Sequence, residues 1–210
     1  MSPSGKSDAV PGIDTPRRKL LKRVGGAAAV GLTAGLAGCS GDGNGEDGAD
    51  TEVYAVSFHW GFKMISPDGT VMDSIDASEG DSIRIHGVNL EPLAEGEEID
   101  VPEAIASTAQ DNYESWEAES VERIAPELGI SEADLEADLK TAEDEYPDHS
   151  LAVTDPNGNQ VFNVELPADM SSPVEKTLSV DSTGGYQYSC ETYCGVGHPY
   201  MTLEDAIEVS

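Results

Sequence analysis

Short stretches in which apolar and polar residues alternate, broken by turn residues, dominate the chain from Val53 onward. The stretches 53–60, 70–76 and 81–89 are rich in β-branched and aromatic residues, and SPDGT and Glu-Gly-Asp sequences separate them. Stretches of this kind predict short β-strands. A hairpin is predicted in LAVTDPNGNQVFNVEL, where alternation flanks an Asp-Pro-Asn-Gly turn. With three more strands in VEKTLSV, GGYQYSC and AIEVS, the pattern predicts an all-β fold, an antiparallel sandwich or barrel.

One segment, residues 99–146, interrupts this pattern, because it contains almost no glycine and places its larger apolar residues at loosely helical spacing. Ser131 precedes a second helical pattern and is followed three residues later by Asp134, which resembles a capping box. We predict two helices, at 102–126 and 132–145, inserted between strands and packed against one side of the sandwich. The sequence leaves open whether this insert is a docking surface or a lid.

The first 38 residues differ from the rest in charge. They contain six of the 11 basic residues but only two of the 41 acidic ones, and TPRRKLLK precedes a run of small apolar residues at 24–38. That run is shorter than the about 20 residues of a membrane-spanning helix, which favours a signal peptide over residues 1–38. Arg17-Arg18 resembles a twin-arginine export signal, and LAGC resembles a lipobox that would lipidate Cys39. We expect an exported domain, lipid-anchored at the outer face of the cell membrane; an unlipidated signal with a chance cysteine is the alternative.

Residues 39–52 are rich in Gly and Asp and predict a flexible tether, which leaves 53–210 as the folded domain. The net charge of the chain is −30, and the 172 residues beyond the leader contain five basic and 39 acidic side chains. A field of this sign repels nucleic acid, which we exclude as a partner. The charge resembles that of proteins from extreme halophiles.

Four side chains with soft or borderline donor atoms fall within twelve residues near the C-terminus: Cys190, Cys194, His198 and Met201. A disulfide between the cysteines is one interpretation, which an exported location allows, but it leaves the His and the Met unexplained. Chance is a second, and the density of donors argues against it. A metal site is the third, and the thioether favours copper over structural zinc.

The spacing Cys-x3-Cys-x3-His-x2-Met in SCETYCGVGHPYM resembles the binuclear copper (CuA) loop of cytochrome c oxidase subunit II, also found in nitrous-oxide reductase. The resemblance covers about 53–93 and 147–210. It implies a cupredoxin-like antiparallel Greek-key sandwich, with 99–146 as a helical insertion, and a centre of two copper ions. The same resemblance implies that Cys190 and Cys194 are the bridging thiolates and that His149 and His198 are the terminal imidazoles. It also implies that Met201 is the axial thioether and that Thr192 contributes its backbone carbonyl.

Three further residues are weighed against this set. We expect His59, in SFHWGF, to pack in the core, and His86, in a strand pattern, to be packed or at the surface. Trp60 lies where the family presents aromatic residues through which electrons enter, and core packing is the alternative for it. The family usually has a pair of N-terminal membrane helices, and this sequence shows no pattern for them. We expect the lipid anchor to take their place.

The resemblance implies electron transfer and not catalysis by this chain alone. Electrons would pass from a soluble carrier, a blue copper protein or a cytochrome c, toward subunit I of a haem-copper oxidase. A copper chaperone for such a site, and the electron-transfer module of a nitrous-oxide-reductase-like or other respiratory system, are alternatives. A binding domain with a disulfide and no metal is a further one.

Overall fold

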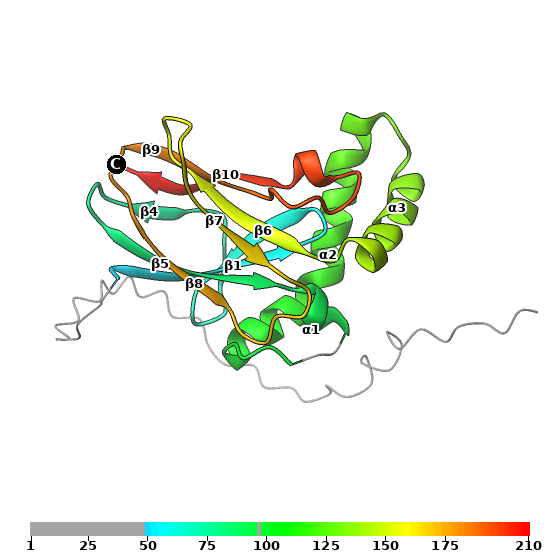
Figure 1. Cartoon of the computed structure of the whole chain (residues 1–210), viewed down its shortest axis with the longest axis horizontal. Coiled ribbons are helices and arrows are strands. Elements are labelled where there is room, and N and C mark those ends of the chain that lie inside the picture. Colours follow the sequence, from blue (N-terminus) through cyan, green and yellow to red (C-terminus); the bar gives the residue numbers. More distant parts are fainter. Residues whose placement is uncertain (1–48, 96–97) are drawn as a thin grey trace, which may run out of the picture. The chain divides into compact units, whose positions relative to one another are not determined.

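The computed structural model describes residues 49–95 and 98–210, which form a sandwich of two five-stranded sheets with helices gathered at one end (Figure 1). The expected signal peptide, Cys39 and most of the expected tether lie outside the described residues, so those predictions stay predictions. Within the described ranges, no helix combines the length and the apolar character that crossing a membrane requires.

The first sheet has the strand order β3-β2-β1-β5-β8. Its strands are β1 (Thr51–Phe58), β2 (Gly61–Ile65), β3 (Val71–Met72), β5 (Ser82–Asn89) and β8 (Val174–Ser179). In β5 the period of two is clear, because Ile83 and Ile85 are buried, whereas the alternating residues Arg84 and His86 are only partly buried. This strand therefore turns one face to the core.

The second sheet has the order β4-β10-β9-β6-β7 and contains the strands that lead into and out of the sulfur-rich loop. Its strands are β4 (Ile75–Ala77), β6 (His149–Thr154), β7 (Gln160–Leu166), β9 (Gly184–Ser189) and β10 (Thr202–Val209). The predicted hairpin is confirmed: β6 and β7 pair in antiparallel fashion around the Asp-Pro-Asn-Gly turn.

The all-β sandwich with a helical insertion is confirmed, and three details of the strands differ from the sequence prediction. The expected strand at 70–76 is divided into β3, in the first sheet, and β4, in the second. The sheets are mixed, since β1 pairs with β5 and β10 with β4 in parallel. The chain leaves the first sheet to form β4 in the second, so β5 returns to β1 in the same direction. The expected strand at 53–60 runs from Thr51 to Phe58 and then turns into β2, which the pattern did not separate.

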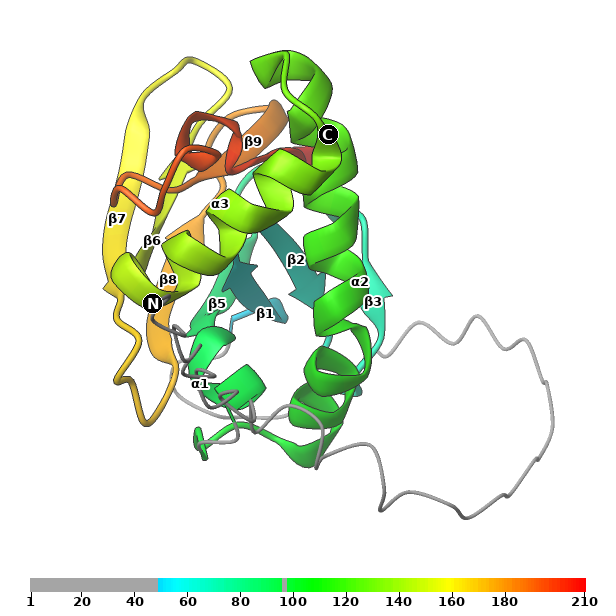
Figure 2. The same ribbon diagram turned by 90° about the vertical axis from the view of Figure 1, so that its right-hand side faces the viewer.

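The helical insert contains the two predicted helices, α2 (Glu103–Leu128) and α3 (Glu132–Glu145). The Ser131 hydroxyl accepts a hydrogen bond from the Asp134 amide, at 3.2 Å, as the capping-box pattern predicted. Gly129 ends α2 with a left-handed φ of 68°. A short helix, α1 (Glu91–Glu95), was not predicted. Figure 2 shows that α2 and α3 lie at the end of the sandwich where the loop between β9 and β10 emerges.

Candidate metal centre

The sulfur-rich loop, residues 190–201, connects β9 to β10 and includes a short 3-10 turn at His198–Tyr200. The amide of Cys190 donates to the carbonyl of Met201 at 3.1 Å, so the two ends of the loop are joined by the sheet. Both cysteines of the loop are buried, and neither is in a disulfide. The disulfide interpretation is therefore not what the structure shows.

The donor atoms of the loop converge on the two sulfurs. The Cys194 Sγ lies 3.7 Å from His198 Nδ1 and 3.6 Å from Met201 Sδ. The Cys190 Sγ lies 3.1 Å from the Thr192 carbonyl oxygen. The main-chain oxygen expected from the family resemblance thus lies beside one sulfur, and the expected thioether lies beside the other.

His149, the first residue of β6, brings the second imidazole to the sulfurs from outside the loop. Its donor nitrogen and the two thiol sulfurs all lie within 4.8 Å of one another. The ring is fully buried, and neither ring nitrogen has a hydrogen-bond partner. Buried imidazole nitrogens are normally satisfied, so an enclosed ring without partners beside two thiols fits a metal ligand.

Ser150, a buried neighbour of His149 that the sequence did not single out, organises the start of the loop. Its amide and hydroxyl lie 3.4 Å and 3.8 Å from Cys190 Sγ. Its hydroxyl oxygen accepts from the amides of Glu191, at 2.8 Å, and Thr192, at 3.1 Å. One serine therefore fixes both the sulfur and the turn that presents the Thr192 carbonyl.

The two thiols influence each other strongly. The Cys194 thiol, which shares its proton with Cys190, lowers the pKa of Cys190 to about 3, and His149 adds to the effect. The same sharing, together with burial, raises the pKa of Cys194. An ion that binds both sulfurs must displace any proton that they hold.

Trp60 is fully buried and lies directly under the loop. Its indole Nε1 donates to the Cys194 carbonyl at 2.6 Å. A Cβ at Gly197 would lie 2.1 Å from the indole Cδ2, and one at Gly195, whose φ is +100°, would lie 2.7 Å from Ala142 Cβ. The glycines of CGVGH thus let the loop lie flat on the ring. Trp60 therefore packs in the core, as the alternative for it expected, and its role in electron entry stays a prediction.

The histidines outside the predicted set have different surroundings. His86 stacks on Tyr54, with ring centroids 4.6 Å apart, and its Nε2 lies 2.7 Å from Glu52 Oε1, which agrees with the expected packed or surface role. His59 is fully buried, as expected of a packing residue. It also lies beside a predicted ligand, because its ring centroid is 4.7 Å from that of His149.

Glu91, the first residue of α1, is the carboxylate of this region, and it is only 6% exposed. Its Oε1 lies 2.6 Å from His59 Nδ1 and 3.9 Å from His149 Nε2. Burial raises the pKa of Glu91, but the two histidines outweigh burial and hold that pKa at about 2. A metal ion about 2 Å from both His59 and Glu91 would hold their donor atoms about 3 Å apart, so the shorter contact is a hydrogen bond.

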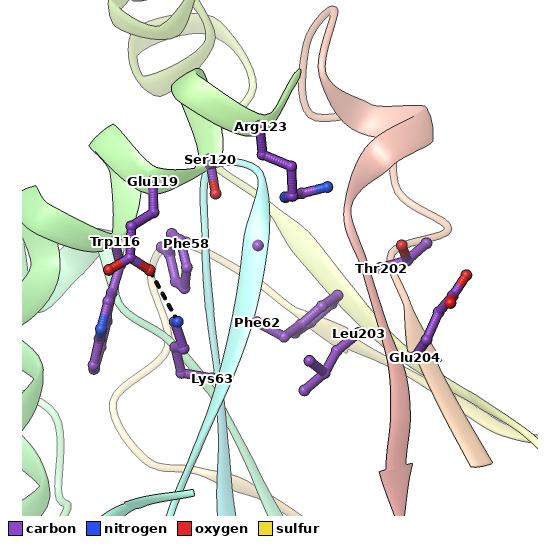
Figure 3. Close-up of a pocket in the computed structure, with 11 residues that line it drawn as sticks. Phe58, Phe62, Lys63, Trp116, Glu119, Ser120, Arg123, Thr202, Leu203 and Glu204 are labelled. Atoms are coloured by element: carbon purple, nitrogen blue, oxygen red, sulfur yellow. Dashed lines mark hydrogen bonds and ion pairs between the residues drawn. The ribbon is translucent and has the colours of Figure 1, made fainter. Parts of the chain in front are cut away.

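The helical insert reaches the sulfur-rich loop through Arg123 of α2. The guanidinium donates to the carbonyls of Trp60 and Tyr200, each at 3.0 Å. Figure 3 shows Arg123 at the upper end of a groove of about 420 Å³ between α2 and the strands β2 and β10. Lys63 lines the same groove and pairs with Glu119 at 3.0 Å.

Three exposed hydrophobic side chains surround the surface of the loop: Tyr193, Val196 and Tyr146, which are 57%, 42% and 39% exposed. The ring of Tyr193 lies 5.1 Å from that of Tyr146, at the end of α3, and 5.9 Å from the imidazole of His198. An aromatic contact therefore connects solvent with a predicted ligand. We call Tyr146, Tyr193 and Val196 the aromatic patch.

Comparisons with known proteins add little to this geometry. No protein-family model matches the chain, and no curated protein matches it. Among solved structures, the chain is similar to the periplasmic domain of subunit II of cytochrome oxidase of Bradyrhizobium japonicum, with 14% sequence identity and a TM-score of 0.40. The match covers 78% of this chain and 86% of that one.

Proposed function

We propose that this chain is an electron-transfer domain whose loop at 190–201 and His149 hold a binuclear copper centre. The observation that carries the proposal is the convergence of two free thiols, two imidazoles and a thioether. Both thiols and His149 lie within 4.8 Å of one another, and His198 and Met201 each lie within 4 Å of the Cys194 sulfur. Soft sulfur with imidazole is a donor set that favours copper.

In this proposal Cys190, Cys194, His149 and His198 would hold the two ions, with Met201 and the Thr192 carbonyl as weaker ligands, and the centre would supply one-electron transfer. A binuclear copper centre with shared thiolates takes up and releases a single electron with little change in its bonds. The chain contributes rigidity, since Ser150 fixes Cys190 by its amide and hydroxyl. The Trp60 indole fixes Cys194 through its carbonyl.

Exclusion of water supports a relay over a substrate-binding catalyst. Cys194, Met201 and His149 are fully buried, and Cys190 is 6% exposed. The partly exposed imidazole of His198 is the ligand nearest the surface. We infer that electrons pass between the centre and a partner protein at the aromatic patch, because Tyr193 contacts both His198 and solvent.

The acidic surface suggests the character of the partner. Glu191 and Glu165 are exposed beside the loop, and Thr192 donates to Glu165 at 3.0 Å. A soluble carrier with an apolar contact area and a basic rim, such as a blue copper protein or a cytochrome c, fits this surface. Subunit I of a haem-copper oxidase is the proposed acceptor, and a nitrous-oxide-reductase-like or other respiratory acceptor is the alternative.

Export by the twin-arginine pathway and a lipid on Cys39 complete the proposal, and both rest on the sequence of the leader. Mass spectrometry of the protein recovered from cell membranes tests them. We expect a chain that begins at Cys39 and carries the mass of the attached lipid. A chain that keeps residues 1–38, or one cleaved without a lipid, would contradict the anchor.

Copper loading of the purified chain tests the central proposal. We expect two copper ions per chain and a near-infrared band from an electron shared between them. A chaperone for such a site would bind one copper and lack the band, and a chain that retains no copper would contradict any copper function.

A further inference from the structure

A buried acid–base pair lies behind His149, on the side away from solvent. His59 is fully buried in the turn that follows β1, and Glu91, on α1, is 6% exposed. The two are joined at 2.6 Å between His59 Nδ1 and Glu91 Oε1. Burying a charged carboxylate is unfavourable unless it has partners, so we ask what the buried Glu91 contributes.

His59 is held between two acceptors. Its Nδ1 faces the Glu91 carboxylate at 2.6 Å, and its Nε2 lies 3.2 Å from the Tyr146 carbonyl. The ring therefore ties the carboxylate to the chain at the end of α3.

The carboxylate also faces the predicted ligand. The Oε1 atom that binds His59 lies 3.9 Å from His149 Nε2, a nitrogen with no hydrogen-bond partner. Asn89 holds this arrangement, because its Oδ1 accepts from the Glu91 amide at 3.0 Å and its Nδ2 donates to the Pro147 carbonyl at 2.8 Å. The carboxylate and the chain just before His149 are thus fixed by one side chain.

We infer that Glu91 and His59 form a positioning pair for His149. The Glu91 carboxylate, 3.9 Å from His149 Nε2, favours the proton on that nitrogen and so leaves Nδ1 free to bind metal. His59 holds the carboxylate in place through its contact at 2.6 Å. The inference rests on the proposed role of His149 as a ligand.

Opposite electrostatic effects distinguish this pair from mere packing. Glu91→Gln removes a negative charge near the centre, which favours the reduced state and raises the reduction potential. His59→Gln removes the imidazole partner of the carboxylate and leaves its negative charge less compensated, which lowers the potential. Loss of packing alone would move both variants in the same direction.

The experiment measures zinc affinity of the metal-free chain and the reduction potential of the copper-loaded chain. Zinc requires no binuclear copper, and competition with a coloured chelator gives its dissociation constant. Glu117→Gln is the matched control, since Glu117 is a glutamate of α2 that is 7% exposed and is not in the His59–Glu91–His149 group. We expect Glu91→Gln to weaken zinc binding by about 10- to 100-fold, as loss of a residue that orients a ligand typically does, and Glu117→Gln to leave it unchanged.

Two results would overturn the inference: equal zinc affinities for Glu91→Gln and Glu117→Gln, or potentials that shift in the same direction in Glu91→Gln and His59→Gln. If Glu91→Gln does not unfold cooperatively, Glu91→Asp replaces it. That variant keeps the charge but withdraws it by one methylene, and we expect weaker zinc binding with a smaller rise in potential. A wild-type chain that binds zinc tightly but only one copper would contradict the proposed function. The zinc affinities of the variants would still test whether Glu91 and His59 position His149.

Discussion

The metal loop at 190–201 and the helical insert at 99–146 meet at the same end of the sandwich, yet they contribute to the site in different ways. The loop supplies donor atoms from its side chains, with His198 Nδ1 and Met201 Sδ each within 4 Å of the Cys194 sulfur. The insert supplies contacts to the main chain. Arg123 donates to two carbonyls beside the loop, and the Tyr146 carbonyl accepts from His59.

The difference shows which kinds of function a sequence displays. A metal ligand must be one of a few residue types at a fixed spacing, so the Cys, His and Met residues of the loop can be recognised in the sequence. A residue that supports the site through backbone carbonyls or packing carries no such constraint on type. The insert, which the sequence left as a docking surface or a lid, contacts the loop at 190–201 through Arg123, and either of those roles stays a prediction.

The largest effect expected on the loop side comes from Cys194→Ser, because a hydroxyl does not replace a shared thiolate. We expect at most one copper per chain and loss of the near-infrared band. Copper analysis and absorption spectra check this, and Cys39→Ser, the same change outside the described domain, is the control. A full spectrum in Cys194→Ser would contradict the bridging role.

A steric test of the loop comes next. Gly197→Ala places a Cβ 2.1 Å from the Trp60 indole, so the ring or the loop must move. Overpacking of this kind costs about 1–3 kcal/mol, and we expect thermal unfolding at lower temperature together with weaker copper retention. Gly158→Ala is the control, since its φ is +82° but nothing lies within 4 Å of the new Cβ. The control can lose stability through backbone strain, but it should retain copper as the wild type does.

The insert side is tested by Arg123→Met, which removes the two hydrogen bonds to the carbonyls of Trp60 and Tyr200. Because the side chain is exposed, we expect a loss of only about 1–2 kcal/mol in the free energy of unfolding. Copper should also be released faster to a chelator. Lys63→Met is the matched control, as it removes the same charge from the same groove without touching the loop. Equal release rates in the two variants would show that the insert is peripheral to the centre.

Met201→Leu has the smallest expected effect. The two side chains are similar in volume, and the thioether is a weak ligand, so the shared-thiolate centre should survive with a shifted reduction potential. Voltammetry and the near-infrared spectrum check this together. Complete loss of copper would show that Met201 is a principal ligand, and an unchanged potential would show that it is none.

Much of the fold was predictable because its signals are local. The strand pattern, the Asp-Pro-Asn-Gly hairpin and the Ser131 cap depend on neighbouring residues, and all three appear in the structure. The parallel pairing of β1 with β5 did not follow from the sequence, since it depends on where the chain crosses between sheets. The short helix α1 was missed because five residues give too little periodicity.

The site divides in the same way. The six predicted donors converge in the structure, although their roles as ligands remain predictions. Ser150 and Glu91 were missed, because a serine or a glutamate in an acidic chain is unremarkable until its neighbours in space are known. The motif LEP around Glu91 offers no signal for a contact that spans 58 residues to His149. His59 was expected only to pack, and its bond to Glu91 likewise joins residues that are distant in the sequence.

Copper stoichiometry, combined with the electron spin resonance spectrum of the loaded full chain, tests the central claim most directly. If both Cys190 and Cys194 bind the centre, we expect two copper ions per chain. The signal of one unpaired electron should then be split by both copper nuclei. One ion per chain with splitting by a single nucleus, or retention of zinc alone, would contradict the account.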